Sequence, residues 1–327
     1  MRFFNREPKP KPAAPPPLFD DAFLRRLEKL SYRSAPWLRG HMMGERRSRN
    51  LRPALDFSDH RSYTMGDDLR HVDWNAYSRH DELFVKLGEA TQRLDLHLLL
   101  DRSPSMSWRD PLATVSKWHG ARQLAGALSY LGLAGGERLY ITPFDQTLGE
   151  SFGPTQGKRQ TIRALQFITD MEPVEVNDQT NRPAVDLTAS LTNYARNHPN
   201  GGLLILLSDL LDTVDPRSGE PAVEPLAEGL RYLTPPRWQV LVIHLLTAQE
   251  LTPTFEGDFD LRDLETAESL PFYFDEATLA QYRLRVRRWC AELQRVCAGR
   301  GATYAQLVAE WPLEQKVLPY LRQRGVL

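Results

Sequence analysis

From residue 94 onward, short continuous runs of apolar residues alternate with longer segments in which apolar residues recur at helical spacing. Such runs are typical of strands buried on both faces, and their alternation with helices favours a mostly parallel sheet with helices on both faces. The sequence therefore predicts an α/β fold, with strands at 94–100, 139–144, 203–207, 239–246 and 302–308. Helices are expected at 111–133, 158–170, 183–195, 222–233, 276–298 and 312–323.

The N-terminal part of the chain differs in character from this alternating region. Residues 1–17 are rich in Pro and Lys and have little to bury, which predicts a disordered tail. Residues 18–93 are expected to form an irregular N-terminal segment that packs on an α/β domain of residues 94–327. Within that segment, 19–32 has the apolar spacing of an amphipathic helix and 83–87 reads as a short strand.

Basic side chains concentrate between Arg25 and Arg52, where few acids accompany them. They could form a surface for an acidic partner, RNA or lipid head groups, or a solvated face with internal ion pairs. The net formal charge of the chain is −1, so the protein as a whole is not drawn to nucleic acid. We favour the solvated face and do not expect a nucleic-acid partner.

The two cysteines and the hydropathy bear on the cellular compartment. Cys290 and Cys297 are seven positions apart in an expected helix, which separates their α-carbons by about 10 Å. A disulfide needs less than about 7 Å, so we expect two buried thiols in a reducing compartment. The apolar runs are far shorter than the roughly 18 residues that cross a bilayer, and the N-terminus lacks the apolar region of a signal peptide. We therefore expect a cytoplasmic protein without a membrane span.

Two of the expected strands end in acidic residues. The first leads directly into Asp101, which the hydroxyls of Ser103 and Ser105 follow, and the third leads into Asp209. Ligands of open α/β sheets bind at the carboxyl edge of the strands, and carboxylate and hydroxyl oxygens suit Mg²⁺. Alternatively, Asp101 caps the next helix and the serines merely turn the chain. The second strand-end acid favours the metal site.

A phosphatase that uses the same edge is the competing interpretation. Phosphatases of the haloacid-dehalogenase type also place an Asp at the end of the first strand. They need a second Asp two residues later as general acid, and Ser103 occupies that position here. The sequence has no lysine-bearing glycine loop for phosphate and no Gly-X-Ser-X-Gly elbow. We expect a non-enzymatic protein and retain a metal-dependent hydrolase as the alternative.

A dense group of charged and aromatic residues precedes the first strand of the expected domain. Its candidate binding residues are Arg61, Asp67, Arg70, Asp73, Trp74 and Arg79. They could form a binding surface, or a salt-bridge network that pins a loop onto the domain. Alternating charges favour the second interpretation.

The segment RSYTMGDDLRHVDWNAYSR, which begins at Arg61, is followed by LHLLLDRSPSM, which begins at Leu96. Together they resemble the domain of unknown function 58 family. In that family a pattern of Arg-Tyr, Gly-Asp, Asp-Trp and Ala-Arg precedes a von Willebrand A-like core. The resemblance is close over residues 33–215 and looser to the C-terminus, and it implies a von Willebrand A-like fold.

The resemblance also implies a metal-ion-dependent adhesion site that holds Mg²⁺, Mn²⁺ or Ca²⁺. Its first and third loops match the residues Asp101, Ser103, Ser105 and Asp209. Its second loop normally supplies a threonine, for which Thr180 is the best match because it precedes an expected helix by a few residues. This chain has Gln179 and Asn181 around it, where the family more often has Gly-Thr-Asp, and Thr188 is the second choice.

Members of the family are typically encoded beside MoxR-type AAA+ ATPases and are thought to act with them in chaperone-like assembly or maturation of other proteins. The resemblance therefore implies a non-enzymatic, metal-dependent protein–protein interaction module. Its expected partners are a MoxR-type AAA+ ATPase and a client protein.

Overall fold

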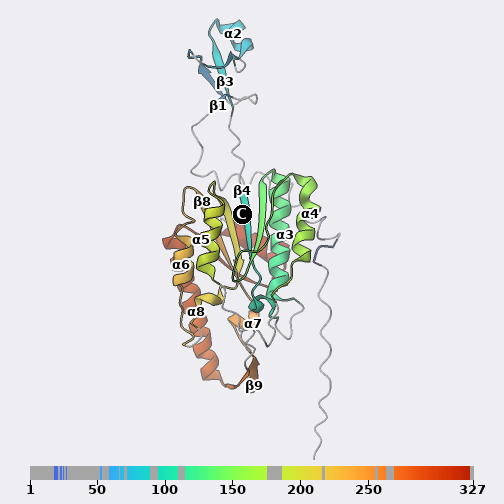
Figure 1. Cartoon of the computed structure of the whole chain (residues 1–327), viewed down its shortest axis with the longest axis vertical. Coiled ribbons are helices and arrows are strands. Elements are labelled where there is room, and N and C mark those ends of the chain that lie inside the picture. The colour runs from blue at the N-terminus through green and yellow to red at the C-terminus, as the bar shows by residue number, and fades with distance from the viewer. Residues whose placement is uncertain are drawn as a thin grey trace, which may run out of the picture. The chain divides into compact units, whose positions relative to one another are not determined.

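The computed structural model of the chain describes residues 52–53, 59–65, 67–69, 72–88, 95–109, 115–174, 186–215, 218–254, 257–262 and 269–324, and positions 18–20, 23, 25 and 27 nearer the N-terminus. The contacts divide the chain into two units (Figure 1). One comprises residues 1–38 and 94–327, and the other comprises residues 39–93. The Pro-rich segment 1–17 and most of the basic stretch from Arg25 to Arg52 lie outside the described residues.

The larger unit is built on a six-stranded sheet in the order β11-β8-β7-β4-β5-β6. Its strands are Asp95–Asp101 (β4), Arg138–Phe144 (β5), Phe152–Gln156 (β6), Gly202–Ser208 (β7), Trp238–Leu246 (β8) and Thr303–Val308 (β11). Neighbouring strands are parallel, except that β6 pairs with β5 in the antiparallel sense. In chain order the sheet reads 3-2-1-4-5-6, which is a doubly wound α/β arrangement. The fold class expected from the sequence is confirmed.

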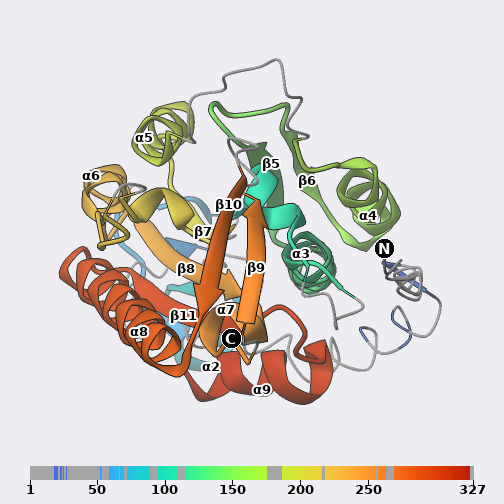
Figure 2. The same ribbon diagram turned by 90° about the horizontal axis from the view of Figure 1, so that it is seen from below.

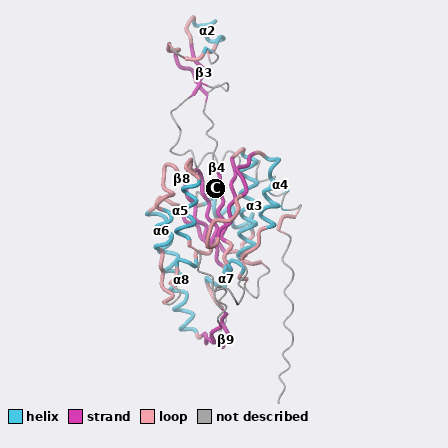
Figure 3. Tube along the Cα trace, viewed as in Figure 1, coloured by secondary structure: helices cyan, strands magenta, loops and turns pink. Residues whose placement is uncertain are grey.

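Helices cover both faces of this sheet (Figures 2 and 3). They are Lys117–Gly135 (α3), Thr161–Asp170 (α4), Leu187–Asn197 (α5), Glu224–Leu230 (α6), Ala248–Leu251 (α7), Glu276–Gly299 (α8) and Leu318–Gln323 (α9). Helices α5, α6 and α8 share one core cluster with the sheet, while α3, with α4 beside it, and α9 lie on the opposite face (Figure 2).

Strand β4 shows why the apolar runs are continuous. All of its residues are buried, because both faces of the strand meet helices. Leu99 belongs to the core that includes Leu191 of α5 and Trp289 of α8. Leu96, three residues earlier, lies against Gly132 of α3, where an added Cβ would come within 2.6 Å of its side chain. Each fully buried leucine contributes about 1.5–3 kcal/mol, so this strand anchors the sheet from both sides.

Several helix boundaries differ from expectation. The helix expected from residue 111 begins at Lys117, because the side chain of Ser116 caps it by accepting a hydrogen bond from the backbone N–H of His119 at 3.2 Å. Asp186 caps α5, which begins at Leu187. Residue 183, where this helix was expected to begin, lies outside the described residues. The helix expected from residue 158 begins at Thr161, because residues 158–160 form a 3₁₀ turn.

Some elements were not anticipated. They are the edge strand β6, the short helix α7, the antiparallel hairpin of Gly257–Arg262 (β9) and Ser269–Phe274 (β10), and a π-helical turn at Leu313–Val317 that precedes α9. Both cysteines are free, as expected; Cys297 is buried in α8, whereas Cys290 is only partly buried. No helix in the described part of the chain is long and apolar enough to cross a membrane.

The smaller unit contains a three-stranded antiparallel sheet in the order β1-β3-β2. Its strands are Arg52–Pro53 (β1), Asp59–Ser62 (β2) and Phe84–Gly88 (β3), and the last agrees with the strand expected at 83–87. Between β2 and β3 lies one short helix, Trp74–His80 (α2), which the sequence analysis did not foresee.

Candidate metal centre

The two strand-end acids lie side by side. Strands β4 and β7 are parallel neighbours with Leu100 in register with Leu207, so Asp101 and Asp209 follow at the same edge of the sheet. The hydroxyl of Ser208 donates a hydrogen bond to Oδ2 of Asp101, which connects the two strand ends. Asp101 and Asp209 are 0% and 1% exposed. The juxtaposition expected from the strand ends is therefore present.

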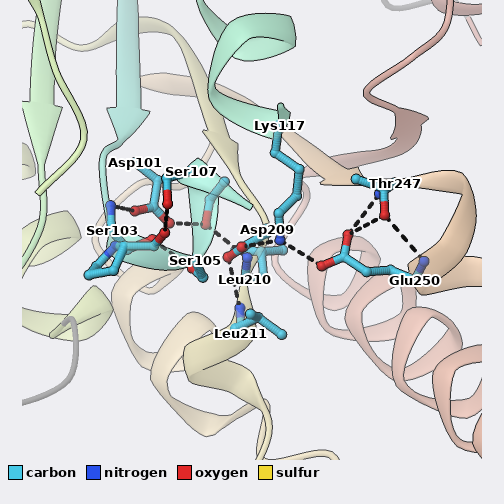
Figure 4. A network of polar contacts seen from close by, with 12 residues as sticks. Asp101, Ser103, Ser105, Ser107, Lys117, Asp209, Leu210, Leu211, Thr247 and Glu250 are labelled. Carbon is cyan, nitrogen blue, oxygen red and sulfur yellow. Dashed lines mark hydrogen bonds and ion pairs between the residues drawn. The ribbon is translucent and has the colours of Figure 1, made fainter. Parts of the chain in front are cut away.

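The loop after Asp101 folds back onto its carboxylate. The backbone N–H of Ser103 donates to Oδ1 of Asp101 at 2.8 Å, and the hydroxyls of Ser103 and Ser105 are 2.9 Å apart. A 3₁₀ turn over Pro104–Ser107 holds the two serines on one side, and both are buried. The sequence DRSPS thus forms a compact set of oxygen atoms around one carboxylate (Figure 4).

A buried lysine joins the site from a third element. Lys117, the first residue of α3, places Nζ 2.6 Å from Oδ2 of Asp209 and 2.7 Å from Oε1 of Glu250. The lysine side chain is 0% exposed. Sequence reasoning missed both Lys117 and Glu250. A basic residue in the first turn of a helix is unfavourable to the helix dipole, and this was the available signal that Lys117 has a specific partner.

Glu250 is fixed by its own short helix. The backbone N–H of Thr247 donates to Oε2 of Glu250 at 2.7 Å, and the hydroxyl of Thr247 accepts from the backbone N–H of Glu250 at 3.2 Å. This reciprocal capping box leaves Oε1 of Glu250 directed toward Lys117 (Figure 4). The end of β8 is thereby connected with the ends of β4 and β7.

The electrostatics of the two aspartates differ. Burial and the nearby charge of Asp209 together raise the pKa of Asp101 to about 7, although hydrogen bonds from Ser208 and Ser103 act in the opposite direction. For Lys117, burial alone would lower the pKa, but the carboxylates of Asp209 and Glu250 raise it above its ordinary value. The ammonium group of Lys117 thus compensates the negative charge of Asp209. Within this group, no positive side chain compensates the charge of Asp101.

The donor set fits a hard divalent cation in part. Carboxylate and hydroxyl oxygens are the ligands that Mg²⁺ prefers, and a bound cation would meet the demand of the buried Asp101. Within the described residues, no group of three or more His, Cys, Asp or Glu side chains could hold a metal ion, so two carboxylates and the hydroxyls of Ser103 and Ser105 would carry the binding. Thr180 lies outside the described residues. Thr188 lies in α5, where its hydroxyl donates to the carbonyl of Pro225 at 3.0 Å.

The charged group at 61–79 has structural roles in the smaller unit. Arg61 and Asp67 form an ion pair at 2.8 Å, and Arg61 with the backbone and hydroxyl of Thr64 lowers the pKa of Asp67 to about 2. Asp73 caps α2 by accepting from the backbone N–H groups of residues 75 and 76. These contacts all lie within the smaller unit.

Not every residue of this group has such a role. Trp74 is 57% exposed and makes an edge contact with Tyr77. Arg79 is exposed on α2, and Arg70 lies outside the described residues.

The histidines of β4 and β8, His97 and His244, are core residues. Nδ1 of His97 is 2.9 Å from the hydroxyl of Tyr194, and Nδ1 of His244 is 2.7 Å from the hydroxyl of Tyr304. Both rings are buried, and burial lowers the pKa of each to about 3. They are neutral hydrogen-bonded side chains near neutral pH.

Comparison with known proteins gives remote relatives. An uncharacterized protein of Mycobacterium tuberculosis (strain ATCC 25618 / H37Rv) is 23% identical over 277 residues, which cover 84% of this chain and 82% of that protein. An uncharacterized protein of Mycobacterium bovis matches to the same extent.

Among solved structures, the conserved hypothetical protein BatB from Bacteroides thetaiotaomicron is 16% identical and covers 71% of this chain and 98% of its own, with a TM-score of 0.41. An aerotolerance-related membrane protein from Bacteroides fragilis is also 16% identical and covers 70% of this chain and 99% of its own, with a TM-score of 0.39. The model of the family described as "Protein of unknown function DUF58" matches residues 59–291, and the chain belongs to this family.

Proposed function

We propose that the protein is a non-enzymatic interaction module whose contact with other proteins depends on a divalent cation held by Asp101, Ser103, Ser105 and Asp209. One observation carries this proposal: two buried aspartates from adjacent parallel strands lie beside paired serine hydroxyls, and Asp101 has no cation of its own in this group. A buried carboxylate is costly without a positive charge, and Mg²⁺, Mn²⁺ or Ca²⁺ would supply one.

The chemistry of the loop argues for binding more than for catalysis. A phosphatase of the haloacid-dehalogenase type needs a second acid two residues after the first, and Ser103 is a hydroxyl whose backbone N–H is used to hold Asp101. A cation bound by few protein ligands keeps open positions, and a carboxylate from a partner protein would complete its coordination shell.

We further propose that the partner is a MoxR-type AAA+ ATPase that acts with this protein in chaperone-like assembly or maturation of a client. The chain belongs to the DUF58 family, and this partner is what the resemblance to that family implies. The expected place of action is the cytoplasm.

The metal centre is tested by thermal unfolding in EDTA and in millimolar Mg²⁺ or Mn²⁺. A ligand at 100 times its Kd stabilises by about 2.7 kcal/mol, so we expect the Tm to rise by roughly 4 °C in the wild type. Asp101→Asn and Asp209→Asn should each abolish the rise, whereas Asp170→Asn, an exposed residue at the end of α4, should retain it. A wild-type Tm that neither Mg²⁺ nor Mn²⁺ changes would rule out the metal centre.

The partner is tested by titrating the MoxR-type ATPase of the same organism into this protein in a calorimeter. Binding in Mg²⁺ that is lost in EDTA and in Asp101→Asn is the expected result. Binding that persists in both would refute the metal dependence, and absence of binding under all conditions would refute the partner. A panel of phosphate esters with no turnover above that of Asp101→Asn supports the non-enzymatic role.

A further inference from the structure

Lys117 is buried in a way that lysine rarely tolerates. Its side chain is 0% exposed, and it stands in the first turn of α3, where the helix dipole is unfavourable to a positive charge. Two close carboxylate contacts, at 2.6 Å to Asp209 and 2.7 Å to Glu250, offset these costs. The lysine is therefore held by the same acid that the proposed metal centre uses.

Glu250 is held in place by contacts of its own, which leave one carboxylate oxygen for Lys117. Its Oε2 is occupied by Thr247, and its backbone carbonyl accepts a hydrogen bond from the hydroxyl of Tyr282 in α8 at 2.9 Å. The glutamate thus has one oxygen left for Lys117 and is anchored independently of the metal loop. The ammonium group is shared between an acid in the proposed centre and an acid beside it (Figure 4).

The charges of this group add up to a value that suits a divalent ion. Asp101, Asp209 and Glu250 together contribute three formal negative charges when ionised, and Lys117 contributes one positive charge, so the buried group carries a net −2. A divalent cation neutralises it, whereas without Lys117 the group would carry −3. Since buried charges interact strongly, one unit changes the preference for cation charge.

We infer that the positive charge of Lys117 sets the affinity of the site for cations and its selectivity for divalent over trivalent ions. The negative charge of Glu250 keeps the lysine from neutralising Asp209 completely. This inference rests on the proposed metal centre. Lys117 is a positioning residue for that centre, not a ligand. Removing its charge strengthens cation binding, while removing the charge of Glu250 weakens it.

Two variants with opposite expected effects test this inference. Lys117→Met retains most of the length of the side chain and removes its charge, and Glu250→Gln retains the shape and removes the negative charge. Binding of Mg²⁺ by calorimetry and of Tb³⁺ by sensitised luminescence is measured for each at one pH. We expect the Mg²⁺ dissociation constant to fall by roughly tenfold in Lys117→Met and to rise by roughly tenfold in Glu250→Gln. The gain for Tb³⁺ in Lys117→Met should exceed that for Mg²⁺.

The controls separate this inference from the metal centre itself. Lys316→Met removes an exposed positive charge and should leave both constants unchanged. If the wild type binds Mg²⁺ and the constants of Lys117→Met and Glu250→Gln are unchanged or move in the same direction, the inference about Lys117 is wrong and the metal centre stands. If neither the wild type nor the variants bind Mg²⁺ or Tb³⁺, both fall. Should Lys117→Met not fold, Lys117→Gln and Glu250→Gln still give the two expected directions.

Discussion

Asp101 is a buried carboxylate in surroundings that only partly satisfy it. It accepts hydrogen bonds from the backbone of Ser103 and from Ser208, yet burial and the proximity of Asp209 raise its pKa to about 7. Because the unfolded chain has an ordinary carboxyl group, the ionised Asp101 costs stability at alkaline pH. Asp101 thus lowers the stability of the metal-free protein, which is typical of a residue that has a role in binding.

At pH 8 in EDTA, Asp101→Asn should therefore increase the free energy of unfolding by about 1–2 kcal/mol, because it removes the buried charge and retains an acceptor for the N–H of Ser103. Urea unfolding measures the change, and Asp170→Asn should stay within about 0.5 kcal/mol of the wild type. A loss of stability in Asp101→Asn would show that the ionised carboxylate stabilises the metal-free fold.

At the scale of elements, the pattern of apolar residues explains which strands could be predicted from the sequence. Continuous apolar runs located the buried strands to within a residue or two, and with them the strand-end positions of Asp101 and Asp209. Strand β6 was missed because FGPTQ lies at the edge of the sheet and has no apolar run. Lys117 was missed because the helix was expected to start at residue 111, which hid the position of the lysine in the first turn. Its partners are also remote in the sequence: Asp209, directly after β7, is 92 residues away and Glu250 of α7 is 133 residues away.

The N-terminal segment meets α3 at a helical glycine. A Cβ on Gly126 would lie 2.3 Å from Cε1 of Phe19, and Phe23 and Leu27 are also buried. The absence of a side chain at Gly126 thus lets the aromatic ring contact the helix directly. The segment that precedes the smaller unit in the sequence is attached to the larger one by this contact.

Gly126→Ala should displace Phe19 and make the segment around it more susceptible to limited proteolysis. Alanine favours a helix over glycine by about 1 kcal/mol, so any loss reflects the lost contact and not the helix itself. Gly135→Ala is the matched control, because its added Cβ would have ordinary contacts at 3.9 Å with Glu137. Equal cleavage rates in both variants would show that the ring has no role in attaching the segment.

At the scale of the whole molecule, the two edges of the main sheet carry different chemistry. The carboxyl edge holds the candidate centre, and α7 lies there directly after β8. Toward the amino edge, His97 stacks on Tyr140 with ring centroids 4.5 Å apart, and Arg138 pairs with Asp95 at the start of β4. The amino edge thus combines an aromatic stack with an ion pair.

The buried histidines make the larger unit sensitive to acid. Burial lowers the pKa of His97 and of His244 from 6.5 to about 3, and His198 and Arg138 add to the effect at His97. Below pH 6.5 the unfolded chain therefore binds protons that the folded protein does not. The stability from each neutral histidine is fully present above pH 6.5 and is lost as the pH falls toward 3, at about 1.4 kcal/mol per pH unit.

The difference between variant and wild type isolates this contribution, since Asp101 acts in the opposite sense as it takes up a proton near pH 7. Between pH 7 and pH 5, His97→Gln should lose about 2 kcal/mol less stability than the wild type, because glutamine does not titrate and still reaches the hydroxyl of Tyr194. His244→Gln should behave likewise next to Tyr304. Urea unfolding at the two pH values measures both, and parallel pH dependences for variants and wild type would mean that the histidines are protonated in the folded protein.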